Sequence, residues 1–232
     1  MLNLRNISYH PPATPVPILK QINLQVAPQQ LTLIVGPSGS GKSTLLEILS
    51  GLAEKTQGTI HWRDQELTSL HLQQLSGLVF QFPERHFCGG TILEELRLGH
   101  PEITSDRIQQ ALTEVGLEQL SLSAKPHALS GGQQRRLALA VQLIRQPHLL
   151  LLDEPAAGMN PSEKEDLMQL IEFIRKRFGM AILLVEHDMK VVMGICERIA
   201  VLEYGTKIAE GTPKEIQCHP KVIEAYLGVA AS

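Results

Sequence analysis

The sequence Gly36-Pro37-Ser38-Gly39-Ser40-Gly41-Lys42-Ser43 is the most informative part of this chain. It fits the pattern G-x-x-x-x-G-K-[ST], follows the apolar run Leu31–Val35 and precedes the half-apolar segment that begins at Thr44. Glycines let backbone N–H groups turn toward a polyphosphate, and the helix start adds the positive end of its dipole. A Gly/Ser-rich turn before a helix is the plainer alternative, but the full spacing with both flanks disfavours it. We therefore expect this strand–loop–helix unit to bind a nucleoside triphosphate.

Two side chains of the loop are expected to contact the ligand directly. Lys42 would reach the β- and γ-phosphates, and the hydroxyl of Ser43 would ligate Mg²⁺. The sequence therefore predicts ATP and Mg²⁺ at this loop, with Thr44 beside them.

A second candidate site follows the apolar run Leu149–Leu152, which ends in Asp153 and Glu154. Asp153 at the strand tip is placed to hold Mg²⁺ through water. Glu154 is placed to polarise the attacking water, because in-line phosphoryl transfer needs an oriented nucleophile. The acidic pair could instead be only a helix cap. Because the acidic pair occurs in a chain that also has the phosphate loop, we favour the catalytic interpretation.

Composition excludes several other classes. The 232 residues carry a formal net charge of −3 and a pI of about 6.3, so no electrostatic footprint for nucleic acid is evident. The three cysteines form no C-x-x-C pair, which disfavours a zinc site and favours reduced thiols in a cytosolic protein. No apolar run approaches the roughly 18 residues that a membrane span requires, and the N-terminus does not resemble a signal peptide. Any membrane role is therefore expected to come through a partner.

Short apolar runs alternate with longer amphipathic segments, which indicates an α/β fold. Continuous apolar runs predict parallel strands buried on both faces at Leu31–Val35, Leu149–Leu152 and Ala181–Val185. Two N-terminal segments, Leu2–Ser8 and Ile18–Val26, are expected to be antiparallel strands. The tail, Pro213 to Leu227, predicts two short helices.

The middle of the chain has a helical period. We expect residues 84–126 to form an inserted helical subdomain, and residues 1–83 and 127–232 to form a catalytic core with an N-terminal β subdomain.

A second glycine-rich turn is Leu129-Ser130-Gly131-Gly132-Gln133, at the start of a predicted helix. Ser130 is a good N-cap, and the two glycines allow close approach by a phosphate. The phosphate loop, this turn and the strand ending in Asp153 and Glu154, in this order, resemble the ATP-binding-cassette (ABC) ATPase family over essentially the whole chain. The resemblance implies a P-loop NTPase fold with a mostly parallel core sheet, an antiparallel β subdomain and an inserted α-helical subdomain.

The resemblance also implies a head-to-tail dimer with two ATP molecules, each between the phosphate loop of one subunit and Ser130–Gln133 of the other. Gln81 matches the glutamine that senses Mg²⁺ and the γ-phosphate. His187 matches the switch histidine that contacts the γ-phosphate; considered alone, it could be an ordinary loop histidine. The catalytic candidates are thus Glu154, His187 and Gln81.

Two positions depart from the family pattern. The interface loop Ala157–Asn160 usually ends in aspartate, so Asn160 keeps hydrogen-bonding capacity but removes a charge. The aromatic residue that stacks on adenine is expected nearer Pro11, where this chain has none. Tyr9 or His10 would then stack on the base, unless Tyr9 is a strand residue facing the core.

Segments 80–87 and 91–99 resemble ATPases of energy-coupling-factor importers. Segments 153–161, 186–195 and 220–228 are similar to ATPases of branched-chain amino-acid importers. The chain is either a hybrid of two ABC ATPases joined near Leu152–Glu154 or one divergent subfamily.

The favoured function is the ATP-hydrolysing motor subunit of an importer, peripheral on the cytoplasmic face of the membrane and bound to membrane-embedded subunits and a second ATPase subunit. A soluble ABC ATPase, such as an iron–sulfur assembly type, is the alternative. A GTPase or small-molecule kinase is disfavoured because such proteins lack the turn Leu129–Gln133.

Overall fold

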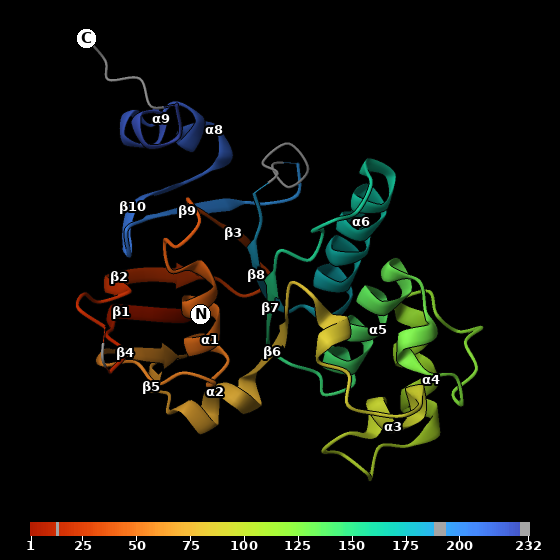
Figure 1. The fold of residues 1–232 in the computed structure, drawn as a ribbon. Coiled ribbons are helices and arrows are strands. Elements are labelled where there is room, and N and C mark those ends of the chain that lie inside the picture. Colours follow the sequence, from red (N-terminus) through yellow and green to blue (C-terminus); the bar gives the residue numbers. More distant parts are fainter. Residues whose placement is uncertain (13, 188–193, 228–232) are drawn as a thin grey trace.

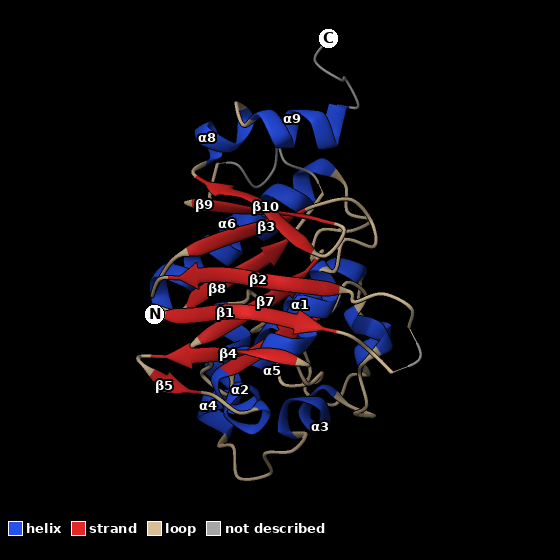
Figure 2. Ribbon diagram, turned by 90° about the vertical axis from the view of Figure 1, so that its left-hand side faces the viewer, coloured by secondary structure: helices blue, strands red, loops and turns tan. Residues whose placement is uncertain are grey.

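The computed structural model describes residues 1–12, 14–187 and 194–227, and its strands form two sheets (Figure 1). The N-terminal sheet is antiparallel and has the strand order β2-β1-β4-β5 (Figure 2). Its strands are β1 (Leu2–Tyr9), β2 (Leu19–Val26), β4 (Gln57–Trp62) and β5 (Gln65–Glu66). The predicted antiparallel pair at the N-terminus is therefore confirmed, with bounds that differ by one residue.

The second sheet has the order β10-β9-β3-β8-β7-β6, and only the edge strand β10 is antiparallel to its neighbour. Its strands are β3 (Leu31–Val35), β6 (Ser76–Val79), β7 (Leu149–Asp153), β8 (Ala181–Val185), β9 (Arg198–Glu203) and β10 (Thr206–Gly211). The three predicted parallel strands β3, β7 and β8 are confirmed as neighbours in one sheet. Because β3, β7 and β8 run parallel, the residues that follow their carboxyl ends meet at one edge.

Helices lie on both sides of this mixed sheet. They are α1 (Lys42–Leu49), α2 (Ser69–Leu75), α3 (Ile92–Arg97), α4 (Ser105–Glu114), α5 (Gly131–Leu143), α6 (Pro161–Phe178), α8 (Pro213–Gln217) and α9 (Pro220–Leu227), with 3₁₀ turns at Pro83–Arg85 (η1) and Pro126–Ala128 (η2). Figure 1 places α3, α4 and α5 on the side of the sheet away from β1 and β2. The two predicted tail helices are α8 and α9. In the described parts of the chain, no helix combines the length and apolar character needed to span a membrane.

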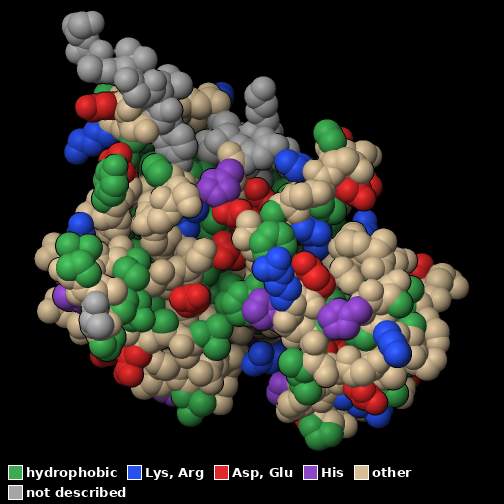
Figure 3. Space-filling model, in the orientation of Figure 1, with side chains coloured by type: hydrophobic (Ala, Val, Ile, Leu, Met, Phe, Trp, Pro, Cys, Tyr) green, Lys and Arg blue, Asp and Glu red, His purple; other side chains and the backbone are tan. Residues whose placement is uncertain are grey.

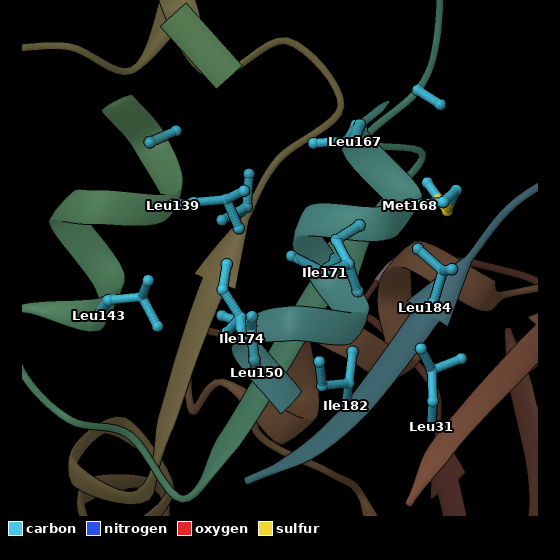
Figure 4. Close-up of a cluster of buried hydrophobic side chains, with 14 of the residues drawn as sticks. Leu31, Leu139, Leu143, Leu150, Leu167, Met168, Ile171, Ile174, Ile182 and Leu184 are labelled. Carbon is cyan, nitrogen blue, oxygen red and sulfur yellow. The ribbon is translucent and has the colours of Figure 1, made fainter. Parts of the chain in front are cut away.

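The mixed sheet is buried on both faces, so neighbouring residues of one strand join different cores. Leu33 packs into the core on the side of α5 and α6, whereas Ile34 packs into the core shared with α1 and the antiparallel sheet. This explains why the strands are apolar without alternation. In Figure 4, Ile171 and Ile174 of α6 lie among Leu150 and other side chains of the sheet. The sheet is thus held rigidly between two packed layers.

Local capping fixes where the helices near the sheet edge begin. At the start of α5, the Ser130 hydroxyl accepts from the backbone N–H of Gln133, and the Gln133 side-chain oxygen accepts from the backbone N–H of Ser130. At the start of α6, Asn160 and Glu163 make the same two hydrogen bonds. The prediction that Ser130 is an N-cap is confirmed.

Candidate functional site

The phosphate loop connects β3 to α1 and is packed so closely that glycine is required at two positions. A Cβ atom on Gly36 would lie 2.2 Å from the carbonyl oxygen of Leu202. Gly41 has a φ of 95°, and a Cβ there would lie 2.6 Å from Cδ2 of Leu19. The loop therefore packs closely against β9 on one side and against β2 on the other.

Lys42 points back into this loop. Its Nζ donates to the carbonyl oxygens of Gly36 (2.9 Å) and Pro37 (3.0 Å), and only 6% of the residue is exposed. Burial lowers the pKa of Lys42, while the carboxylates of Glu154 and Asp153 oppose that shift. Among the described residues, the buried hydroxyl of Ser40 has no hydrogen-bond partner. A buried cation beside an unpaired hydroxyl fits a polyphosphate ligand.

A cavity of about 500 Å³ lies over the loop. Its described lining is Ile18, Ser38, Gly39, Gly41, Lys42, Ser43, Thr44, Gln81, Glu154 and His187. The structure thus brings the phosphate loop together with all three predicted catalytic residues, although they follow different strands. Cavities of this size hold small molecules.

Asp153 is the last residue of β7 and lies beside the start of α1. The Ser43 hydroxyl lies close enough to interact with its carboxyl group. Burial raises the pKa of Asp153, Glu154 raises it further, and the Ser43 contact works against both. The pair offers two oxygen donors of the kind that Mg²⁺ prefers. In the part of the chain that the structure describes, no cluster of three or more Asp, Glu, His and Cys side chains that could hold a metal occurs.

Glu154 has an uncommon backbone conformation, with a φ of 43°. Its N–H donates to the carbonyl of Val185 (3.0 Å), and its own carbonyl accepts from Ala157 (3.0 Å). No helix starts here, because α6 begins at Pro161 with Asn160 as its cap. The alternative that the acidic pair is only a helix cap is therefore wrong.

Both carboxylate oxygens of Glu154 are engaged by predicted site residues. Oε2 accepts from Nε2 of Gln81 at 2.6 Å, and Oε1 contacts Nε2 of His187. Gln81 lies just beyond β6, and His187 just beyond β8. The ends of three adjacent strands therefore converge on one carboxylate.

The turn Ser130–Gln133 is absent from the described lining of this cavity. It begins α5, and a Cβ on Gly132 would meet nothing within 4 Å. Within one chain, the second glycine-rich turn faces open space rather than its own phosphate loop.

The adenine-stacking candidates do not line the cavity among its described residues either. Tyr9 is half-buried, ends β1 and packs against the core that includes Leu19. The ring of His10 contacts the carbonyl of Thr14 through Nε2 at 2.8 Å. Ile18 is the residue of this region that reaches the cavity.

Sequence motifs of this chain match one family over most of its length. The family profile described as "ABC transporter" matches residues 19–157, which is more than half of the chain. The chain belongs to the ABC transporter family. A second profile, "Branched-chain amino acid ATP-binding cassette transporter", matches residues 206–232 of this ABC ATPase.

Two relatives represent the two importer types. The high-affinity branched-chain amino acid transport ATP-binding protein LivG of Escherichia coli K12 is 39% identical, over 91% of this chain and 92% of its own. The energy-coupling factor transporter ATP-binding protein EcfA2 of Latilactobacillus sakei is 36% identical, over 95% of this chain and 81% of its own. Both similarities extend across Leu152–Glu154, where the two resemblances change over. Relatives of either type thus match both halves of the chain.

Solved structures of ABC ATPases confirm the fold. CbiO1 of Clostridium perfringens, described as part of the ABC transporter complex cbiONQ, matches with a TM-score of 0.85 and 28% identity, over 98% of this chain and 95% of its own. The dimeric post-hydrolysis state of the cassette MJ0796, bound to ADP and Pi, matches with a TM-score of 0.79 and 29% identity, over 91% of this chain and 98% of its own.

Two polar residues near the site lie outside the sequence predictions. Arg135 of α5 donates to backbone carbonyls of the loop after Glu154, and buried Glu186 accepts from the N–H of Ala156 in the same loop. The sequence signal for Glu186 is a carboxylate directly after an apolar strand and directly before His187.

Proposed function

We propose that this chain is the ATP-hydrolysing motor subunit of a membrane importer. The observation that carries the proposal is the convergence of Lys42, Ser43 and Glu154 on one cavity, with Asp153 directly before Glu154 at the end of β7. This set supplies phosphate-binding, metal-binding and water-orienting groups at one edge of a rigid sheet. The names of the relatives as transport proteins favour the importer over a soluble ABC ATPase.

Each residue has a separate task in hydrolysis. Loop N–H groups and Lys42 bind the phosphates. Ser43 and Asp153 would hold Mg²⁺, and the ion would supply positive charge to offset the charge that develops on the phosphates. Glu154 orients the water for in-line attack, and His187 and Gln81 position the carboxylate and the γ-phosphate. Ile18 borders the cavity on the side of Tyr9 and His10, one of which is proposed to contact the base.

A second ATPase subunit completes the site. Ser130–Gln133 faces open space in one chain, and this turn has a capped helix start with two glycines, a geometry suited to binding a phosphate. A head-to-tail arrangement places this turn over the phosphate loop of the other subunit. The dimeric structure of MJ0796 bound to ADP and Pi is a precedent for dimer formation in a similar cassette.

The membrane-embedded partner is proposed to dock in a second cavity, of about 280 Å³, between β6, η1, α3 and α5. The surface is hollowed between the part built on the sheets and the part built on α3–α5 (Figure 3). Phe80, Phe87 and Leu96 line the 280 Å³ cavity, and Leu98, which also lines it, is 56% exposed. Such a groove beside Gln81 would connect partner movement to the nucleotide site from the cytoplasmic face.

Glu154→Gln tests hydrolysis. The amide keeps the shape of the carboxylate but loses its charge, so we expect ATP binding within about twofold of wild type and turnover reduced about 100-fold or more. With ATP, this variant should elute as a dimer in size-exclusion chromatography with light scattering. The control is Glu163→Gln, an exposed glutamate at the start of α6. Normal hydrolysis by Glu154→Gln would assign the catalytic role elsewhere.

Capture of Glu154→Gln from detergent-solubilised host membranes with ATP and Mg²⁺ tests the partner. Mass spectrometry should identify a membrane-embedded subunit, which Leu98→Asp should lose while ATP binding is retained. Leu70→Asp is the matched control, because Leu70 is 62% exposed and lies on α2, outside the groove. Recovery of soluble proteins alone would favour the non-transport alternative.

A further inference from the structure

The loop that follows Glu154 is held from two sides by side chains that bind its backbone. Arg135 of α5 donates from Nε to the carbonyl of Pro155 at 2.7 Å and from Nη2 to the carbonyl of Ala157. On the other side, Oε1 of Glu186 accepts from the N–H of Ala156 at 2.9 Å. A cation thus binds the loop carbonyls while an anion binds the N–H group between them.

Glu186 is an unusual residue for its position. It is 6% exposed and directly follows β8, whose residues are all apolar. Its second oxygen, Oε2, accepts from the backbone N–H of His187 at 3.3 Å. Burial raises the pKa of Glu186, while these two backbone hydrogen bonds lower it. A buried carboxylate is costly, and here both oxygens are used to fix backbone next to the catalytic candidates.

The backbone that Glu186 binds lies close to a residue in a strained conformation. Glu154 has a left-handed φ of 43°, and its N–H donates to Val185, the residue directly before Glu186. A non-glycine residue keeps such a conformation only when neighbouring contacts hold it. The end of β8 therefore supports Glu154 by three means: the Val185 carbonyl, the Glu186 carboxylate acting through Ala156, and the imidazole of His187.

We propose that Glu186 is a positioning residue for ATP hydrolysis, which holds Ala156 and His187 so that the Glu154 carboxylate faces the phosphate loop. The proposal rests on the proposed role of Glu154. Glu186 itself does not line the nucleotide cavity among its described residues, so it acts through its neighbours. Arg135 lies two residues after Gln133 in α5, so its hydrogen bonds also connect this loop to the turn expected to meet the second subunit's ATP.

The test compares Glu186→Ala with Glu186→Gln in the 232-residue chain. Stoichiometry of bound fluorescent ATP analogue gives the fraction of competent protein, and kcat is expressed per bound nucleotide. For Glu186→Ala we expect kcat to fall about tenfold or more, while the Kd for ATP stays within about twofold of wild type, because the phosphate contacts are intact. Glu186→Gln keeps one acceptor for Ala156 and should recover kcat to within about threefold of wild type.

Glu163→Ala is the matched control, because it removes another glutamate that accepts from a backbone N–H, here that of Asn160 at the far end of the loop from Glu154. It should leave both constants unchanged. The proposal is overturned if kcat per bound nucleotide is unchanged in Glu186→Ala, or if Glu186→Gln is as slow as Glu186→Ala. If Glu154→Gln hydrolyses ATP normally, the proposed function of the site fails instead, so the two failures are distinguishable.

Discussion

Nε2 of Gln81 donates a 2.6 Å hydrogen bond to Oε2 of Glu154, across a sequence separation of 73 residues. This contact joins the end of β6 to the end of β7, next to the groove proposed for the membrane partner. His187 occupies the other oxygen of the same carboxylate. Each carboxylate oxygen has a second lone pair, so Glu154 can accept from a water molecule while Gln81 and His187 hold it in place. A partner in the groove that moved the residues before Gln81 would therefore shift the orientation of this carboxylate.

Gln81→Ala should raise the Mg²⁺ concentration needed for half-maximal ATPase activity several-fold. The reason is that the variant loses a proposed metal-sensing amide while Ser43 and Asp153 remain. ATP binding measured without Mg²⁺ should not change. A magnesium titration of ATPase activity checks this, with the exposed Gln109→Ala as control. An unchanged magnesium dependence would remove Gln81 from the metal site.

Lys42→Ala should weaken ATP binding about tenfold or more, because the variant loses the buried ammonium that is proposed to bind the phosphates. The fold should persist, since β3 and α1 keep their apolar contacts. Isothermal titration with ATP gives the affinity, and exposed Lys125→Ala provides the comparison. Equal affinities for wild type and Lys42→Ala would argue against the loop assignment.

Ser130→Arg should block dimer closure while leaving ATP binding by the single chain nearly unchanged. The turn lies outside the described lining of the chain's own cavity, so a bulky cation there meets only the second subunit. Introduced into Glu154→Gln, it should abolish the ATP-dependent dimer seen by light scattering. The exposed Ser121→Arg variant tests for a general effect of added charge. A dimer that still forms would mean that the interface lies elsewhere.

The parts of the site that could be predicted from sequence are those whose residues are adjacent in the chain. The phosphate loop and the strand tip at Asp153 carry their chemistry and their strand context together. Arg135 and Glu186 could not be predicted in this way, because each binds backbone of a loop at least 20 residues distant. Every residue type offers a backbone carbonyl, so a hydrogen bond to the backbone does not require a particular residue type that could be recognised in the sequence.

The fold shows the same division. β3, β7 and β8 are continuous apolar runs, buried on both faces, and are found as predicted. β10 is an edge strand with charged Lys207 and Glu210 and no comparable apolar run, so only its pairing with β9 identifies it. Tyr9 illustrates a second limit: its aromatic character suits base stacking and core packing equally, and the packing against the core appears only in three dimensions.

Cys196 should be unreactive in the folded protein. Burial raises its pKa from the ordinary 9.0 to about 11, whereas Cys88 and Cys218 are exposed. At pH 8, a maleimide reagent should therefore label two thiols quickly and the third only after denaturation. Rapid labelling of all three would show that the region around Cys196 opens.

The same pKa shift predicts a loss of stability in alkali. Between pH 9 and about 11 the unfolded chain releases the thiol proton that the folded protein retains, so the free energy of unfolding falls as pH rises through this range. In Cys196→Ala, the part of this fall in the free energy of unfolding that comes from the thiol should be absent. Urea denaturation of both proteins at pH 8 and pH 10 measures the difference.

The close packing of the phosphate loop has a consequence for biosynthesis. Gly36 and Gly41 lie against Leu202 and Leu19, and Gly205 lies against the carbonyl of Ile18. The phosphate loop is thus packed against the hairpin of β9 and β10, which is translated long after the loop itself. A growing chain on the ribosome therefore cannot complete this packing until residue 205 has emerged.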